Sequence, residues 1–315
     1  MRIEDFQAPR EVEQGFDPFF PEDPEGLVHP DAHVSTLVKA ESPIPIENWV
    51  LPIDHFSASS LNMLEICPRQ WQQRYLQGRK EPPGQGLVLG SLTHSGIKFG
   101  LDVKLVTEAD PDLEDMVTYY HDAVWPQTID RYGGEGEVVW DDKPEDVRKK
   151  GVELVSVYHP RITTLQPEAI EHEFRIDLGL QVPITGYIDL VQAHGRPSID
   201  FKASSKRRPS LKPDWRIQGR VYQLVIPRPV DFHQITTGRT PEVITGLETD
   251  EMVEPYSERI AIQTKRRIAE ALNEANRFYA ELGPDDDWPM RGIHHDWRCS
   301  PKWCAYRKDC PVWQT

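Results

Sequence analysis

The spacing of hydrophobic positions changes near residue 168, from a helical period to strict alternation. Before that point, apolar residues recur three and four positions apart, after a run of serines that can cap a helix. This pattern predicts a helix that Pro68 splits just after Cys67. The glycines between positions 84 and 90 are typical of a turn, so the next helix is expected over residues 91–101. Two more helices are predicted, over residues 113–132 and 144–163.

Beyond residue 168 the alternation of apolar and polar side chains predicts strands. The strands are expected over residues 170–178, 182–191, 198–203, 232–237 and 243–247. Residues 214–226 return to a helical period, and a long charged helix is expected over 255–282. This order of elements predicts an α/β fold, with a catalytic core over about 168–250 and a helical insertion over about 103–165.

The first 50 residues carry no regular period and are acidic and rich in proline, which predicts a poorly ordered tail ahead of one domain over 51–315. No apolar stretch reaches the roughly 18 residues of a membrane span. The start of the chain lacks the layout of a secretion signal, so a cytoplasmic protein is expected. The net charge is 36 − 51 = −15, which excludes a protein that coats nucleic acid through bulk charge but not an enzyme with a local basic lining.

Two acids in neighbouring predicted strands are the strongest candidates for chemistry. Asp189 lies within one apolar hairpin strand, and Asp200 lies in the next between Ile199 and Phe201. Paired carboxylates suit Mg²⁺ or Mn²⁺, and Lys202 shares a strand face with Asp200, where it can orient a water for attack on phosphorus. The same Asp-x-Lys spacing at 102–104 and 141–143 lies in polar surroundings and indicates solvated surface charge.

Other polar side chains are candidates for a functional role only if they lie near these two acids. His94 lies on the helix predicted after the glycine-rich turn and is a candidate Mn²⁺ ligand, or else a surface histidine. Gln218 and Tyr222 stand four apart on one helix face. Gln218 can bind a phosphate or position the lysine, whereas Tyr222 can also be a core residue. Glu171 and Glu173 either extend the acidic site or lie on a solvated edge.

Three of the four cysteines fall in one short C-terminal stretch: the set is Cys67, Cys299, Cys304 and Cys310. In a reducing compartment such a cluster indicates a metal or cofactor rather than disulfides. Zinc sites commonly contain a C-x₂-C pair, which is missing here, so an iron–sulfur cluster fits better. Zinc with His294 or His295, and four unrelated buried thiols, remain the alternatives. The sequence contains neither a phosphate-binding loop motif nor a nucleophile elbow.

Taken in order over residues 56–312, these motifs resemble the PD-(D/E)XK nucleases, in particular the RecB-type branch with an iron–sulfur cluster. The similar segments are 57–61 through Cys67 and Pro68, Gly90 with His94, 186–189, 199–202, Gln218 with Tyr222, and the terminal cysteine triplet. The resemblance implies a central mixed β-sheet flanked by helices, with a helical insertion and a C-terminal cysteine cluster over 255–315.

The resemblance also implies roles for these residues. His94, Asp189, Asp200 and the Phe201 carbonyl would bind Mg²⁺ or Mn²⁺, and Lys202 would assist the attacking water beside Gln218 and Tyr222. The four cysteines would hold a 4Fe-4S cluster. The basic run of Lys206, Arg207 and Arg208 is either a contact to DNA phosphates or a solvated loop.

The function expected from this reading is a metal-dependent DNA exonuclease in recombination, repair or phage DNA processing, with a helicase or single-strand annealing protein as a possible partner. One alternative is a nuclease that trims DNA for CRISPR adaptation. The other is a non-catalytic DNA-binding or assembly module with a structural metal.

Overall fold

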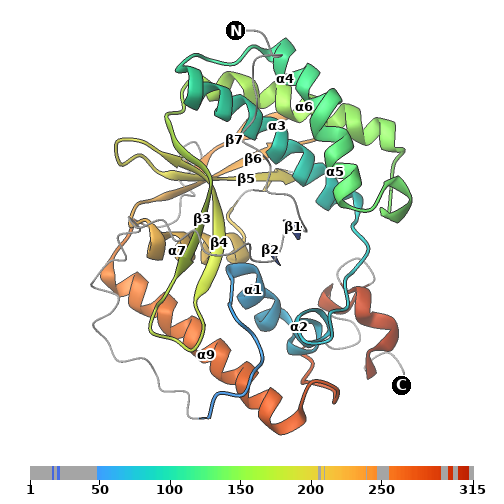
Figure 1. Cartoon of the computed structure of the whole chain (residues 1–315), viewed down its shortest axis with the longest axis vertical. Helices are drawn as coiled ribbons and strands as arrows, with labels where there is room; N and C mark the ends of the chain where they lie inside the picture. Colours follow the sequence, from blue (N-terminus) through green and yellow to red (C-terminus); the bar gives the residue numbers. More distant parts are fainter. Residues whose placement is uncertain are drawn as a thin grey trace.

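The computed structural model describes residues 16–17, 20–21, 48–204, 207–208, 210–238, 240–246, 255–291, 297–300 and 304–311. A five-stranded mixed sheet lies between two layers of helices (Figure 1). Its strands, in spatial order, are β3 (Pro167–Ile176), β4 (Ile184–Gln192), β5 (Ser198–Ser204), β6 (Val230–Thr236) and β7 (Glu242–Ile244). Only β5 and β6 are parallel; the other neighbours are antiparallel. The mixed α/β sheet expected from the sequence is therefore confirmed.

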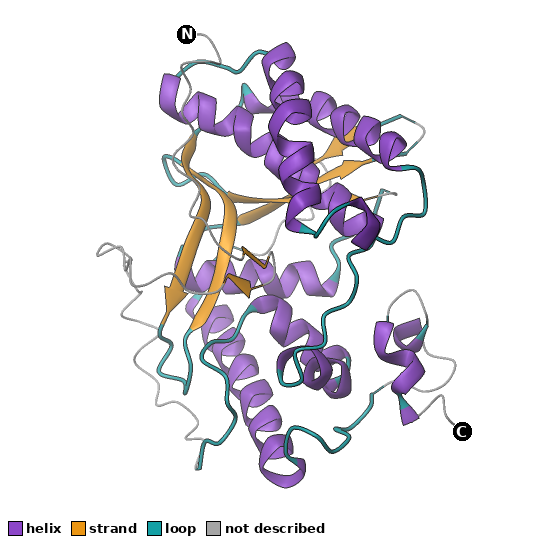
Figure 2. Cartoon of the chain, turned by 45° about the vertical axis from the view of Figure 1, so that its right-hand side comes forward, coloured by secondary structure: helices purple, strands orange, loops and turns teal. Residues whose placement is uncertain are grey.

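The two faces of the sheet are covered by helices from different parts of the chain (Figure 2). One layer consists of α3 (Gln85–Thr107), α4 (Leu113–Tyr119), a π-helical segment (Tyr120–Val124), α5 (Trp125–Arg131) and α6 (Pro144–Ile162). The other consists of α1 (Ala58–Ile66), α2 (Pro68–Tyr75), α7 (Pro213–Val225) and α9 (Glu258–Leu282). Each layer has its own buried apolar cluster, so the sheet is apolar on both faces. No helix in the described ranges is long and apolar enough to cross a membrane.

The helix split expected at Pro68 is present, with α1 ending at Ile66 and α2 beginning at Pro68. Ser57 caps α1 by accepting a hydrogen bond from the backbone N–H of Ser60. Because proline has no N–H, it is tolerated at the start of α2, and Cys67 is left extended between the two helices. This local break sets the position of the first cysteine.

The expected turn over residues 84–90 is wrong, because Gly86 and Gly90 lie inside α3. A glycine costs a helix about 1 kcal/mol relative to alanine. Val88 and Leu92, on the same helix, are fully buried against the other helices of their layer, and this packing outweighs the local preference.

The helix predicted over 113–132 is interrupted by the π-helical turn at Tyr120–Val124. Pro126 follows directly and has no N–H to donate to the preceding turn, which favours such a widened segment. Two further short elements lie outside the expectation: β1 (Phe16–Asp17) and β2 (Phe20–Pro21) pair within the tail, where the sequence shows no strand period. The expectation of a poorly ordered tail otherwise falls outside the described residues.

The start of the described domain is attached to α9 by one buried side chain. Asn276 accepts hydrogen bonds from the backbone N–H groups of Val50 (2.8 Å) and Leu51 (3.0 Å) and donates to the carbonyl of Asn48 (3.3 Å). A second attachment joins α2 to the turn after α9, where Gln72 donates to two carbonyls and Trp71 stacks on Trp288. These contacts bring the two ends of the domain together.

Helix α6 approaches the π-helical turn so closely that only glycine fits at position 151. A Cβ there would lie 1.9 Å from the Tyr120 hydroxyl oxygen. We expect Gly151→Ala to lower the free energy of unfolding by about 1–3 kcal/mol, because neither helix can shift without disturbing a packed layer. Urea denaturation measures the change.

Two variants control this experiment. Gly90→Ala places the same methyl group in open space within α3 and is expected to stabilise the protein by up to about 1 kcal/mol. Tyr120→Phe removes a buried hydroxyl that has no hydrogen-bond partner in the described structure, and it should recover part of the loss caused by Gly151→Ala. A Gly151→Ala protein as stable as wild type would contradict this packing.

Candidate active site

Strands β4 and β5 separate at the two acids that the sequence singled out. Their only registered pair among the described residues is Leu190 with Ile199. Beyond it, the carboxylate of Asp189 accepts a hydrogen bond from the backbone N–H of Phe201 at 2.7 Å. A side chain thus replaces the next ladder bond, and the strands form a fork. Asp189 and Asp200 both lie at this fork, as the sequence pattern predicts.

Asp200 is closed into a ring of four polar side chains. Lys202 forms an ion pair with Asp200 at 2.6 Å and donates to the Gln218 carbonyl oxygen at 3.0 Å. Gln218 donates to the Tyr222 oxygen at 2.6 Å, and Tyr222 donates to Asp200 at 3.1 Å. Helix α7 supplies Gln218 and Tyr222 from one face, because four residues make about one turn. The ring fixes the lysine ammonium beside the carboxylate.

Burial shifts the titration of the site. Asp200 is 1 % exposed and Tyr222 is 3 % exposed. Burial, together with the charges of Asp200 and Asp189, raises the pKa of Tyr222 well above its usual value, so its hydroxyl stays protonated and donates to Asp200. Burial, helped by the nearby Asp200 carboxylate, raises the pKa of Asp189 to about 6, while His94 acts in the opposite direction.

His94 reaches the fork from α3, in the opposite helical layer. Its Nδ1 lies 3.5 Å from a carboxylate oxygen of Asp189, and its ring meets the Phe201 ring edge-on with centroids 5.9 Å apart. Because α3 is far longer than expected from the sequence, His94 lies in mid-helix rather than near a helix start. The structure therefore brings His94, Asp189 and Asp200 to one place.

The donors at the fork suit a hard divalent cation. They are two carboxylates and one imidazole, and the Asp200 oxygen that faces Lys202 is buried without a hydrogen bond of good geometry. Within the described ranges, no three His, Cys, Asp or Glu side chains are gathered tightly enough to enclose a metal ion. The donor atoms at the fork are of the types that a hard divalent cation prefers, although the side chains do not enclose such a cation in this arrangement. We treat their assignment as metal ligands as a proposal.

The basic run that follows β5 is only partly described. Lys206 lies outside the described residues. Arg207 is exposed, and the backbone N–H of Arg208 donates to the Gln234 side chain at 3.2 Å. Gln234 on β6 is the strand partner of Lys202 on β5. The backbone of Arg208 is therefore bound to the strand next to the one that carries Lys202.

Sequence reasoning missed a buried polar chain behind Phe201. Tyr158 and the Nδ1 of His233 are 2.7 Å apart, and the Nε2 of His233 lies 3.1 Å from Asp231. The rings of Tyr158 and His233 both contact Phe201 on the face away from Asp200. The available signal was the alternation of Asp231 and His233 within a strand that is buried at every position.

The two glutamates kept as alternatives lie on β3 and are exposed. Glu171 has a left-handed backbone with φ of +47°, which interrupts the pairing of β3 with β4. Glu173 bonds with Tyr187, and burial together with this carboxylate raises the pKa of the Tyr187 hydroxyl. Both side chains are exposed, as on a solvated edge, while the register of β3 with β4 puts Glu171 opposite Asp189 at the fork.

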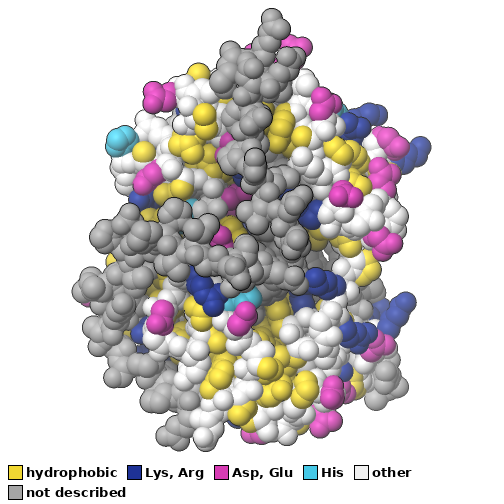
Figure 3. Space-filling view, viewed as in Figure 1, with side chains coloured by type: hydrophobic (Ala, Val, Ile, Leu, Met, Phe, Trp, Pro, Cys, Tyr) yellow, Lys and Arg dark blue, Asp and Glu magenta, His cyan; other side chains and the backbone are white. Residues whose placement is uncertain are grey.

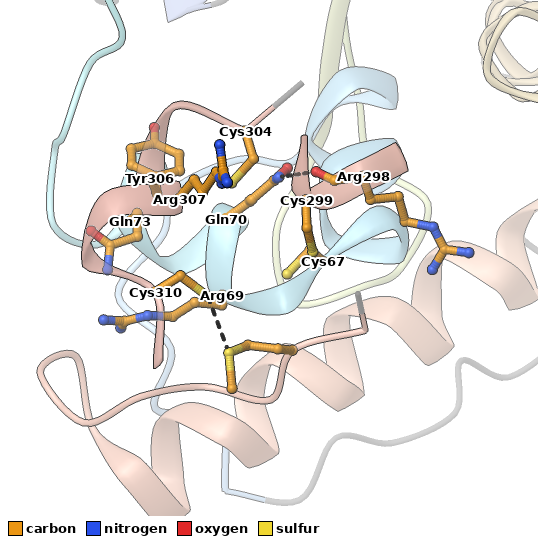
Figure 4. A pocket seen from close by; sticks show the side chains of 11 residues that line it. Cys67, Arg69, Gln70, Gln73, Arg298, Cys299, Cys304, Tyr306, Arg307 and Cys310 are labelled. Atoms are coloured by element: carbon orange, nitrogen blue, oxygen red, sulfur yellow. Dashed lines mark hydrogen bonds between the residues drawn. The ribbon is translucent and has the colours of Figure 1, made fainter. Parts of the chain in front are cut away.

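All four cysteines line one pocket, although Cys67 is more than 200 positions from the others (Figure 4). Cys67 enters from the start of α2, and the others from two 3₁₀ turns, Trp297–Cys299 and Ala305–Asp309, and their flanks. Contacts of other side chains hold these segments together: the Tyr306 hydroxyl donates to the carbonyl of Arg79 at 2.7 Å, and Arg79 pairs with Asp309. The four cysteines thus share one pocket, but among the described residues no three of them lie close enough together to hold a metal ion, so the cluster expected from the sequence stays a prediction.

The four thiols lie in surroundings that are apolar and cationic. Cys67 and Cys304 are each 8 % exposed, and none of the four forms a disulfide. Burial raises the pKa of the Cys304 thiol, and the thiols of Cys67 and Cys310 add to this effect. Cys310 instead contacts the Met290 sulfur at 3.3 Å. Four thiols in one pocket fit a soft metal or cluster in donor type; His294 and His295 lie outside the described residues.

Comparison with known protein families gives one match that covers most of the chain. The profile of the PD-(D/E)XK nuclease superfamily matches residues 55–311, which include the fork, the ring around Asp200 and the cysteine pocket. No curated protein matches significantly. The solved structure titled "Crystal structure of SSO0001" is 16 % identical over 72 % of this chain and 98 % of its own, with a TM-score of 0.33, too low to support an argument about either fold. On the profile match, the chain belongs to the PD-(D/E)XK nuclease superfamily.

Proposed function

We propose that the protein is a divalent-metal-dependent DNA exonuclease, in which Asp189, Asp200 and His94 bind the metal together with the Phe201 carbonyl. The observation that carries this proposal is the ring that holds Lys202 2.6 Å from Asp200 at the mouth of the strand fork. Superfamily membership supports hydrolysis of phosphodiester bonds in DNA. Support for digestion from ends comes from the motif order, which resembles the RecB-type branch.

The residues of the chain divide the work. When bound, Mg²⁺ or Mn²⁺ would neutralise charge on the phosphate and lower the pKa of a water. Lys202 holds and orients the attacking water, since its ammonium is fixed between Asp200 and Gln218. Gln218 and Tyr222 position the lysine and the carboxylate, rather than touching the substrate. The hydrogen bond from Phe201 keeps one oxygen of Asp189 aligned at the fork.

DNA contacts must come from local groups, because the chain carries a net charge of −15. On the face shown in Figure 3, the described Lys and Arg side chains are interspersed with Asp and Glu. The run of Lys206, Arg207 and Arg208 begins four positions after Lys202 in the sequence. We place the phosphate contacts there. A role in recombination, repair or phage DNA processing is part of the same proposal.

Digestion of end-labelled linear and closed-circular DNA with Mn²⁺ or Mg²⁺ tests the proposal. We expect linear DNA to be shortened and circles to survive. Lys202→Ala should lower the cleavage rate by about 10²–10⁴-fold and leave DNA affinity unchanged, because the lysine acts on the attacking water. Asp200→Ala should abolish cleavage. Lys150→Ala, which breaks only an exposed pair with Asp142, is the control and should cut normally.

The outcomes separate the alternatives. Cutting of circles would show an endonuclease. DNA binding without cleavage in the wild type, with no effect of Lys202→Ala, would indicate a binding or assembly module. Cleavage by Lys202→Ala at the wild-type rate would contradict the role given to the lysine.

Metal affinity should depend on pH through Asp189. Its raised pKa of about 6 means that the metal must displace a proton below that pH. We expect the apparent Kd for Mn²⁺ to rise about tenfold per pH unit below 6 and to level off above 7. Calorimetric titration of the full chain measures this. His94→Asn removes the imidazole, so the pH dependence left in that variant belongs to the carboxylate.

The same shift predicts a stability effect in metal-free protein. Because the folded pKa lies above the unfolded one, the neutral form stabilises the fold below about pH 4, and that stabilisation is lost as pH rises through about 6. Asp189→Asn should therefore raise the Tm of metal-free protein above pH 7 while abolishing Mn²⁺ binding. An unchanged or lower Tm would contradict the burial of this charge.

We also propose that the cysteine pocket holds a 4Fe-4S cluster that fastens the C-terminal segment to α2. Support comes from four cysteines that line one pocket without forming disulfides, and from the lack of a C-x₂-C pair in the sequence. Protein purified without oxygen should contain about four irons and four sulfides per chain and absorb near 400 nm. Cys67→Ser should lose both. Zinc, or no metal, in such protein would contradict the cluster.

A further inference from the structure

Two further basic residues, Lys212 and Arg208, lie beside Lys202 on the side of the sheet that α7 covers. Lys212 immediately precedes α7, and its ammonium lies 5.2 Å from the centre of the Trp215 ring. Trp215 stacks on Phe232, with centroids 5.9 Å apart and planes inclined by 15°. The ammonium of Lys202 lies 5.9 Å from the centre of the Phe232 ring. Lys202 and Lys212 therefore contact one stacked pair of aromatic rings.

Arg208 joins this group from the loop after β5. Its backbone N–H is anchored on Gln234, which pairs with Lys202 across the parallel strands. Its Nε atom is buried and has no hydrogen-bond partner in the described part of the chain. A buried guanidinium N–H without an acceptor is costly, because the group has lost water and gained nothing in return.

Only one of the three cations is paired with an acid in the described part of the chain. Lys202 is paired with Asp200, but no carboxylate within the described ranges lies within ion-pair distance of Arg208 or Lys212. Asp214 is the one acid whose charge favours protonated Lys212, whereas burial and the charges of Arg208 and Lys202 lower the pKa of Lys212. An anion placed between Arg208 and Lys212 would satisfy the free N–H and relieve the repulsion.

We propose that Arg208 and Lys212 form a binding position for a second backbone phosphate of the substrate strand, adjacent to the phosphate that is cut. This inference rests on the proposed nuclease function, since it assigns a neighbour to the scissile phosphate. Lys202 is already bound to Asp200 and Gln218. It therefore lies between the position of the scissile phosphate and that of the second phosphate. Trp215 and Phe232 hold the two ammonium groups apart on a rigid apolar surface. The position sets the register of the strand at the fork.

Binding of short DNA in EDTA, followed by fluorescence anisotropy over a range of salt concentrations, tests this assignment without cleavage. We expect Arg208→Gln/Lys212→Gln to weaken binding about tenfold to hundredfold and to lower the slope of log K against log salt by about 1, as loss of one phosphate contact does. Lys212→Arg keeps the charge and should restore most of the slope in a protein whose Arg208 is intact.

Lys143→Gln is a matched control, because Lys143 also precedes a helix that begins with proline. It is exposed and lies in the Asp141–Lys143 segment, which contacts the first residue of α3, nine positions before His94. This variant should bind DNA like the wild type. Thermal unfolding of each variant checks that a weak binder is folded.

A neutral methylphosphonate, moved one linkage at a time along the strand, locates the contacted phosphate. In the wild type, one position beside the cut linkage should weaken binding when neutralised, and in the double variant the same position should have no effect. Unchanged affinity and slope in a folded double variant, or equal sensitivity to the methylphosphonate in both proteins, would overturn the inference. If the wild type binds DNA through these residues but cuts none, the proposed nuclease function fails, and with it the placement beside a cut linkage, whereas the phosphate contact of Arg208 and Lys212 is retained.

Discussion

The hydrogen bond from the Phe201 N–H to the Asp189 carboxylate is the contact on which the site depends. It takes the place of a ladder bond, so β4 and β5 diverge beyond the Leu190–Ile199 pair. The divergence leaves room at the fork for two carboxylates, which regular pairing would press together at a cost in repulsion. Burial then makes ionisation of Asp189 unfavourable, and a divalent cation would offset that cost. One backbone N–H thus couples strand geometry to the chemistry of the site.

Both helical layers must be packed on the sheet before the site is complete. His94 comes from α3 on one face, and Gln218 and Tyr222 come from α7 on the other. Phe201 connects the two sides, since its ring contacts His94, Tyr158 and His233 while its neighbours Asp200 and Lys202 face α7. Residues in two separate hydrophobic cores therefore position the polar side chains at the fork. These side chains belong to helices and strands rather than to loops, which keeps their positions rigid.

The acidic chain concentrates positive charge where the proposed substrate would lie. Lys202 and Lys212 contact the Phe232–Trp215 pair, and the charge of Arg208 acts on Lys212 although neither Arg208 nor Lys212 has an ion-pair partner among the described residues. On the face shown in Figure 3, the described Lys and Arg side chains are interspersed with Asp and Glu. Such a distribution favours a phosphate backbone at one place and weakens contacts at others. The cysteine pocket is separate from these basic residues. It lies next to α2, which Gln72 and Trp71 join to Trp288 in the segment after α9.

The sequence by itself determined the order of helices and strands, the split at Pro68, and the shared faces of Asp200 with Lys202 and of Gln218 with Tyr222, because these follow from local period and spacing. Only the tertiary structure decided that α3 runs through Gly86 and Gly90, that Asp231 and His233 lie behind Phe201, and that Lys212 joins Lys202 on one aromatic pair. Each of these depends on contacts between residues distant in the chain, where packing outweighs local propensity. The spacing of residues in the sequence shows which side chains share one face of a helix or strand. It does not show which distant residues pack against that face.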